Sequence, residues 1–231
     1  MMENIAENIA EISRKIAAAQ ARSPYAAQKV QLLAVSKTYP IENVRAAAAA
    51  GQLAFGENRV QELVDKYEQN PELEWHLIGH LQTNKVKYII GKTCLIHSLD
   101  SLELAKEIEK RSASQDVLTR VLVQLNIAEE ETKSGLMENE LADFLDEVCG
   151  LAHLRVCGLM TIGPHVEDPE TIREVFARLR QLRDEQRAIT RPNCEMKLLS
   201  MGMSGDYEIA VEEGADIVRV GSAIFGQRVY S

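Results

Sequence analysis

The chain has 231 residues, of which 45% are hydrophobic, and it carries 26 Lys and Arg against 35 Asp and Glu, for a formal net charge of −9. This acidic excess argues against a nucleic-acid partner, because proteins of that class neutralise phosphates with clustered basic side chains. No run approaches the roughly 18 consecutive apolar residues of a membrane-spanning helix. The length fits one large domain or two small ones, and the hydrophobic share suffices for a buried core.

The N-terminal segment and the cysteines bear on where the protein works. Residues 1–21 carry Glu3, Glu7 and Glu11 and contain no continuous apolar run, so they do not resemble a secretory signal. The four cysteines have neither the paired spacing of a metal site nor the density of a disulfide scaffold: Cys94, Cys149, Cys157 and Cys194. We therefore expect buried free thiols and a cytoplasmic protein.

The chain begins with an amphipathic pattern. Ile5, Ile9, Ile12 and Ile16 recur at the spacing that places apolar side chains on one face of a helix. We predict a leading helix over residues 1–22 that packs against the rest of the domain. The stripe spans only two heptads, but a coiled-coil interface is an alternative that the pattern leaves open.

After Pro24 the sequence alternates between short β-rich runs and helical runs. Eight strands are predicted, over residues 30–35, 52–55, 74–78, 94–97, 117–125, 154–160, 196–199 and 216–220. Helices are predicted between them, over residues 41–50, 58–69, 84–90, 101–111, 138–148, 169–189 and 206–213. This alternation indicates parallel strands joined by right-handed crossovers.

Eight such units in about 200 residues fit a closed (β/α)8 TIM barrel better than an open sheet. Several strands are almost continuously apolar, as expected for a sheet that is covered on both faces. No Gly- or Pro-rich linker divides the chain, so we predict a single α/β domain over residues 1–231. An open doubly wound sheet is the alternative, but no GxGxxG follows the first strand.

The carboxyl ends of the predicted strands carry the candidate binding residues, because barrel active sites lie at that end. Ser204, Gly221 and Ser222 follow the seventh and eighth strands, where barrels often hold phosphate groups. Ser204 stands where helix 206–213 begins, so its hydroxyl and the amides of the first turn could bind a dianion. An ordinary Ser N-cap beside a tight Gly turn is the alternative.

Lys37 and Arg219 belong to the same set of strand ends. Burial at the mouth of an apolar strand would lower the pKa of the Lys37 amine and favour a Schiff base, whereas a solvent-exposed lysine is the alternative. An amine and an anion site together suit pyridoxal 5′-phosphate (PLP). Arg219 either pairs internally with Glu57 or another acid, or faces the pyridine nitrogen of such a cofactor and keeps it unprotonated.

Other polar residues are weaker candidates. The histidines lack metal-ligand spacing and are interpreted as core or surface residues: His76, His80, His97, His153 and His165. Lys133 lies in a polar loop after the fifth strand and is a minor candidate for a second Schiff-base amine.

Six runs of the sequence are specific enough to indicate a family. They are residues 33–38 (LAVSKT), 55–62 (FGENRVQE), 75–85 (WHLIGHLQTNK), 158–162 (GLMTI), 199–206 (LSMGMSGD) and 218–226 (VRVGSAIFG). In this order they closely resemble the pyridoxal phosphate homeostasis protein family, the YggS/PROSC group. Ser222 stands where many members have threonine, which keeps the hydroxyl.

The resemblance implies a barrel like the N-terminal domain of alanine racemase, with PLP joined to Lys37 by a Schiff base. Asn58 and Ser200 would line the ring, Arg219 would face its nitrogen, and the remaining residues would hold the phosphate. The complete set of cofactor residues implied is Lys37, Asn58, Ser200, Ser204, Arg219, Gly221 and Ser222.

The function implied is intracellular PLP homeostasis: a monomer that holds vitamin B6 cofactor and supplies or buffers it for apo PLP-dependent enzymes, without robust turnover, metal or catalytic residues. The chief alternative is a PLP-dependent racemase, but related racemases carry an additional β-domain for which a barrel of this length leaves no residues. A Schiff-base aldolase that uses Lys37 without a cofactor would not explain Arg219.

Overall fold

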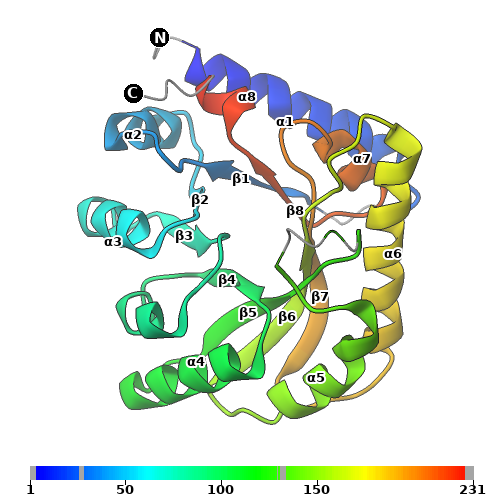
Figure 1. The fold of residues 1–231 in the computed structure, drawn as a ribbon. Coiled ribbons are helices and arrows are strands. Elements are labelled where there is room, and N and C mark those ends of the chain that lie inside the picture. Colours follow the sequence, from blue (N-terminus) through cyan, green and yellow to red (C-terminus); the bar gives the residue numbers. More distant parts are fainter. Residues whose placement is uncertain (1–3, 26–28, 129, 131–133, 227–231) are drawn as a thin grey trace.

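Eight parallel strands close into a barrel in the order in which they occur along the chain (Figure 1). The computed structural model describes residues 4–25, 29–128, 130 and 134–226. The strands are β1 (Gln31–Val35), β2 (Ala54–Glu57), β3 (Glu74–Leu77), β4 (Leu95–Leu99), β5 (Thr119–Leu125), β6 (Leu154–Thr161), β7 (Cys194–Ser200) and β8 (Ile217–Val220). All eight predicted strands are confirmed, and the open sheet is excluded because β1 pairs with both β2 and β8.

Helices follow the strands and cover the outside of the barrel (Figure 1). They are α1 (Ile5–Arg22), α2 (Ile41–Ala49), α3 (Val60–Gln69), α4 (Leu102–Gln115), α5 (Leu141–Val148), α6 (Pro169–Arg187), α7 (Tyr207–Glu212) and α8 (Ser222–Phe225). The first turn of α6 shows why such helices begin where they do: Asp168 accepts a hydrogen bond from the Thr171 N–H, and proline occupies the first helical position.

Two segments differ from the prediction. Residues 84–90 were expected to form a helix, but the chain forms a 3-10 turn, η1 (Thr83–Tyr88), in which Val86 is the buried residue. Val86, Ile89 and Ile90 are all buried, but so short a run is marginal as an α-helix. The single turn α8 was not predicted, since four residues are too few to show a helical period.

Helix α1 packs along α7 and α8 (Figure 1). Ile5, Ile9, Ile12 and Ile16 are 2–8% exposed, so the chain's own core covers the apolar stripe, as the packing hypothesis expected and the coiled-coil alternative did not. Burial of each isoleucine contributes about 1.5–3 kcal/mol. The Asn8 side chain also donates a hydrogen bond of 2.9 Å to the Ile224 carbonyl, which ties α1 to α8.

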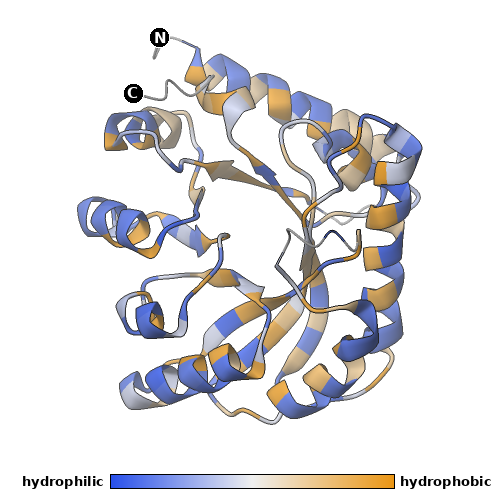
Figure 2. Ribbon diagram, viewed as in Figure 1, coloured by the Kyte–Doolittle hydropathy of each residue, from blue (hydrophilic) through white to orange (hydrophobic). Residues whose placement is uncertain are grey.

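Alternation along the strands separates two buried regions. Ala34 and Phe55 belong to the large core between the strands and the helices, whereas Leu33 and Ala54 belong to a small cluster inside the barrel. Successive side chains of a strand point to opposite faces. Figure 2 shows the corresponding pattern on the helices, whose hydrophobic residues turn towards the barrel. Lys37 therefore continues the inward series of β1, and Ser36 continues its outward series.

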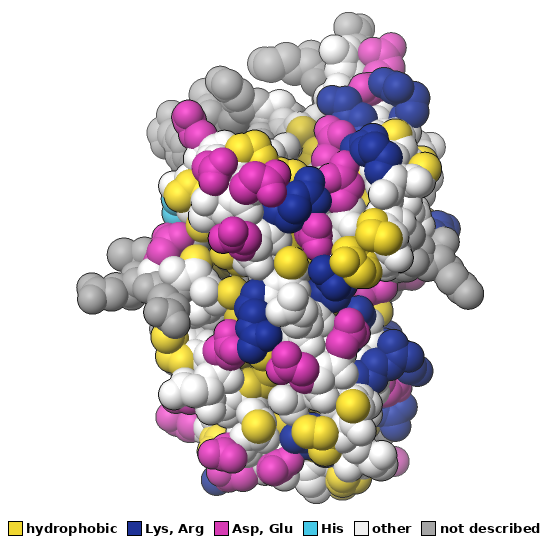
Figure 3. Space-filling view, turned by 90° about the vertical axis from the view of Figure 1, so that its right-hand side faces the viewer, with side chains coloured by type: hydrophobic (Ala, Val, Ile, Leu, Met, Phe, Trp, Pro, Cys, Tyr) yellow, Lys and Arg dark blue, Asp and Glu magenta, His cyan; other side chains and the backbone are white. Residues whose placement is uncertain are grey.

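The surface carries charges of both signs. On the face that includes α6 and α7, acidic and basic side chains are interspersed and no single basic patch is seen (Figure 3). Arg173 of α6 pairs with Glu212 at 2.7 Å across these helices, which is one reason for the mixture. Within the described part of the chain, no helix combines the length and apolarity needed to cross a membrane.

Candidate functional site

A cavity of about 280 Å³ opens at the carboxyl end of the barrel. Six of the seven residues predicted to bind a cofactor line it: Lys37, Asn58, Ser204, Arg219, Gly221 and Ser222. Its apolar lining comes from Val35, Ile78, Ile162 and Met203. None of these four was identified from the sequence as a lining residue, although Ile78 and Ile162 lie two residues beyond the inward-facing His76 and Met160.

Lys37 lies directly after β1 and is half-buried at the cavity. Thr38, the next residue, has φ of 69°, a left-handed conformation that is unfavourable for a β-branched side chain. Such strain costs about 1–3 kcal/mol and persists only where the surroundings enforce it. Here the Thr38 N–H donates a hydrogen bond of 2.6 Å to Glu62 Oε1.

Arg219 points from β8 into the barrel and is 4% exposed. Its guanidinium donates to Ser200 Oγ at 2.7 Å and to the Thr161 carbonyl at 2.8 Å, and both of these acceptors are uncharged. Burial lowers the pKa of Arg219 to about 10, while the charge of Asp206 opposes that change. The side chain is therefore still a cation at neutral pH.

Glu57 does not pair with Arg219, which corrects one alternative from the sequence. It follows an inward-facing glycine in β2 and so points outward, towards α3. There it accepts hydrogen bonds from Ser36 Oγ at 2.6 Å and from Lys66 Nζ at 2.7 Å. Burial raises the pKa of Glu57 to about 7, and Lys66 limits the rise.

Ser200 does not line the cavity but lies below Arg219 in the barrel interior, where it is fully buried. A chain of hydrogen bonds continues from it: His97 Nδ1 lies 2.9 Å from Ser200 Oγ, and His97 Nε2 lies 2.9 Å from His76 Nδ1. Burial lowers the pKa of His76 to about 4 and that of His97 well below its ordinary value. Both rings are therefore neutral at pH 7.

Of the two roles expected for the histidines, core or surface, His76 and His97 have the first, but their link to Arg219 was missed. Strand alternation places His76 on the inner face of β3 and His97 on the inner face of β4. That pattern is the sequence signal from which the polar layer could have been found. The layer consists of His76, His97, Ser200 and Arg219, and we call it the inner polar layer.

Two loops form a cup at one side of the cavity, made of Ser204, Gly205, Gly221 and Ser222. Ser204 Oγ accepts a hydrogen bond of 3.3 Å from the Gly221 N–H, so the serine joins the two loops. The alternative in which Ser204 is an ordinary N-cap of α7 is excluded, because that position belongs to Asp206. The amides of Asp206 and Tyr207 donate hydrogen bonds to the Met203 carbonyl and so do not point to a ligand in the cup. The groups that face the cup are the Ser204 hydroxyl and the glycine-containing segments.

Close backbone packing explains two glycines around the cavity. A Cβ atom on Gly221 would lie 3.2 Å from the Val35 carbonyl oxygen, so the two backbones would have to move apart by a few tenths of an ångström. A Cβ atom on Gly79 would lie 2.3 Å from the Asn58 carbonyl oxygen. Gly79, which follows β3, therefore makes room for the backbone of Asn58, and Asn58 lines the cavity.

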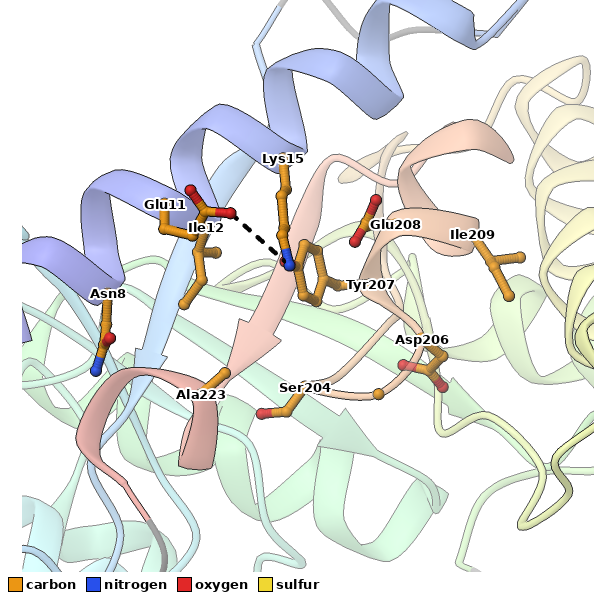
Figure 4. Close-up of a pocket in the computed structure, with 11 residues that line it drawn as sticks. Asn8, Glu11, Ile12, Lys15, Ser204, Asp206, Tyr207, Glu208, Ile209 and Ala223 are labelled. Atoms are coloured by element: carbon orange, nitrogen blue, oxygen red, sulfur yellow. Dashed lines mark ion pairs between the residues drawn. The ribbon is translucent and has the colours of Figure 1, made fainter.

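A second cavity, of about 250 Å³, lies on the other side of the Ser204–Gly205 segment (Figure 4). Figure 4 shows Asn8, Glu11 and Lys15 projecting into it from α1. Because Ser204 and Gly205 line both cavities, this short segment is what separates the cup from α1. The position of α1 thus bears on the shape of the cup.

The donor set of the first cavity fits PLP. The cavity offers a primary amine, a guanidinium and two hydroxyls, and the glycine at position 221 leaves no side chain over the cup. Apolar side chains provide surface for an aromatic ring. Among the described residues no group of His, Cys, Asp and Glu is arranged to hold a metal ion. Lys133, the minor candidate for a second amine, lies outside the described residues.

Comparisons with known proteins agree with this chemistry. The family described as "Alanine racemase, N-terminal domain" matches residues 3–229. A relative from Aquifex aeolicus named pyridoxal phosphate homeostasis protein is 45% identical over 230 residues, which cover 98% of this chain and 100% of the relative.

Solved structures give the same fold. PipY of Synechococcus elongatus, solved with PLP bound, is 34% identical with a TM-score of 0.83, covering 96% of this chain and 100% of that one. An alanine racemase from Clostridium difficile is 14% identical with a TM-score of 0.74, covering 98% of this chain and 57% of that one. The second likeness concerns the fold alone.

Proposed function

Because the chain belongs to the pyridoxal phosphate homeostasis protein family, we propose that it binds PLP in the cavity at the carboxyl end of its barrel and holds it for delivery to other proteins. The proposed role is that of a carrier or buffer in PLP homeostasis. The recipients would be apo forms of PLP-dependent enzymes, and the carrier would act inside the cell as a single-domain monomer.

One observation carries the proposal: an amine, a buried cation and a glycine-containing cup converge on the same cavity. When bound, PLP supplies an aldehyde that condenses reversibly with amines. Lys37 is the amine that would hold it covalently, and the cup of Ser204, Gly205, Gly221 and Ser222 would hold its phosphate. Asn58 lines the same cavity and would contact the ring.

Arg219 argues against chemistry that needs a protonated pyridine nitrogen. Its guanidinium remains charged at neutral pH, since its lowered pKa is still about 10. Facing the pyridine nitrogen, this cation would keep the nitrogen unprotonated and so weaken the electron sink that carbanion chemistry requires. Ser200 would not contact the ring. It would act through Arg219, whose NH1 group donates a hydrogen bond of 2.7 Å to Ser200 Oγ.

The test is to load the purified protein with PLP, reduce it with borohydride and map the phosphopyridoxyl group by peptide mass analysis. We expect a yellow protein with the label on Lys37, no label in Lys37→Ala, and full labelling in the matched exposed variant Lys110→Ala. A colourless protein that takes up no PLP would refute cofactor binding. Turnover of any proteinogenic amino acid at enzyme-like rates would refute the carrier role.

A further inference from the structure

Three charged side chains lie behind Lys37, between the outer face of the barrel and α3. We call Glu57, Glu62 and Lys66 the Lys66 cluster. The side chains of Glu57 and Lys66 are 0% and 7% exposed, and that of Glu62 is 22% exposed. None of the three lines the cavity, so the proposed function does not yet account for them.

Lys66 uses all three protons of its ammonium group. Nζ donates to Glu57 Oε1 at 2.7 Å, to Glu62 Oε1 at 2.8 Å and to the backbone carbonyl of Ser36 at 2.7 Å. Ser36 is the residue immediately before Lys37, and its hydroxyl also donates to Glu57 Oε1 at 2.6 Å. The cluster therefore fixes the peptide on the N-terminal side of Lys37.

Glu62 fixes the peptide on the other side. Its Oε1 atom accepts the 2.6 Å hydrogen bond from the Thr38 N–H, at the residue whose φ of 69° is strained. A strained conformation of this kind persists only where several contacts enforce it. One connected group thus holds both neighbours of Lys37 while the Lys37 side chain points into the cavity.

Stability alone does not explain the cluster. The Glu57 carboxyl and the Lys66 ammonium are removed from water here, Glu62 is partly buried, and Glu57 Oε2 is buried without a hydrogen-bond partner. Buried ion pairs are often no more stabilising than apolar side chains of the same volume. Their hydrogen bonds do, however, define one geometry for the backbone that they contact.

We propose that Glu62 and Lys66 are positioning residues for Lys37: they hold the backbone on both sides of it so that its amine is presented to the aldehyde of PLP. This inference rests on the proposed function. It adds that the covalent step depends on a charged group outside the cavity, whereas the binding of the phosphate and the ring does not.

The test compares two ligands that differ at one group. PLP has an aldehyde that reacts with Lys37, whereas pyridoxine 5′-phosphate has an alcohol at the same place and binds without reacting. For Glu62→Ala and Lys66→Met we expect the rate of covalent PLP loading at Lys37 to fall about tenfold or more, as for a small misplacement of a reacting group. The affinity for pyridoxine 5′-phosphate should stay within about twofold, because the cup is untouched.

Two further variants serve as controls. Glu62→Gln keeps an oxygen that can accept from the Thr38 N–H, so we expect it to restore most of the loading rate. Asp65→Ala removes a carboxylate from the same helix, where its Oδ1 atom accepts a hydrogen bond from the exposed Gln61 side chain, and should load as the parent protein does.

The outcomes separate the two proposals. If the parent protein takes up no PLP at Lys37, the proposed function is wrong. If the parent loads and Glu62→Ala loads equally fast, only the positioning role is wrong. Equal loss of PLP loading and pyridoxine 5′-phosphate affinity would reduce the cluster to a structural role and also overturn the inference. Should Lys66→Met fail to fold, Glu62→Ala decides, since its side chain is partly exposed.

Discussion

Two buried cations lie on opposite sides of the barrel wall and have different surroundings. Lys66, outside the wall, is paired with two carboxylates at 2.7 and 2.8 Å. Arg219, inside the wall, donates its hydrogen bonds to a hydroxyl and a backbone carbonyl. The histidines that continue the inner polar layer are neutral, because burial lowers the pKa of each.

The difference indicates what each charge is for. A buried cation with carboxylate partners is compensated, and its hydrogen bonds organise the backbone that they contact. A buried cation whose hydrogen-bond partners are uncharged is not neutralised, so its charge can interact with a ligand in the cavity. Removal of Lys66 should therefore affect mainly folding, and removal of Arg219 should affect mainly the bound ligand.

The largest effect on folding is expected for Lys66→Met. Removal of the ammonium leaves the Glu57 carboxyl buried without its charged partner. Because the pKa of Glu57 is already about 7, the group can take up a proton, and the free energy of unfolding should fall by about 1–3 kcal/mol. Urea unfolding at pH 7 measures this loss, with the exposed variant Lys110→Ala as the matched control. A loss below about 1 kcal/mol would mean that the ion pair does not compensate the buried carboxylate.

The two regions should also respond to pH in opposite directions. Burial raises the pKa of Glu57 from 4.5 to about 7, so the folded protein binds its proton more tightly and this group's contribution to stability falls as pH rises between those values. Burial lowers the pKa of His76 from 6.5 to about 4, so its contribution to stability rises with pH over that window. Each effect amounts to at most roughly 3–4 kcal/mol.

Single substitutions should reveal how each group makes stability depend on pH. Relative to the parent, Glu57→Gln should gain stability as pH increases from about 4.5 to 7, and His76→Gln should gain stability as pH decreases from about 6.5 to 4. Denaturant unfolding at a series of pH values measures both differences. Parallel profiles for parent and variants would show that neither group titrates differently in the folded protein.

The smallest effect on folding is expected for Arg219→Met. Removal of this cation deletes two hydrogen bonds but also relieves the cost of burying a charge, so the free energy of unfolding should change by about 1 kcal/mol or less. Its effect should appear instead in the ligand, as a changed absorbance spectrum of bound PLP. The charge-reversed variant Arg219→Glu should change that spectrum further, and an unchanged spectrum would contradict contact with the ring nitrogen.

Much of the site could be predicted because it lies at the ends of regular elements. Lys37 continues the inward series of β1, and Gly221 with Ser222 ends β8, so a period of two and a barrel topology place them at one rim. For Ser204, the alternative of an ordinary N-cap is excluded, because the N-cap of α7 is Asp206. One or two residues of uncertainty at a helix start are enough to change which group a hydroxyl contacts.

Periodicity along the chain is enough to predict the barrel, the packing face of its first helix and the residues gathered at its carboxyl end. Which buried charges meet depends instead on the packing of the whole fold. Glu57 pairs with Lys66 rather than with Arg219, and His97 reaches Ser200 across the barrel interior. Such contacts depend on the face to which a side chain points and on the register between strands, which bring together groups that no local pattern relates.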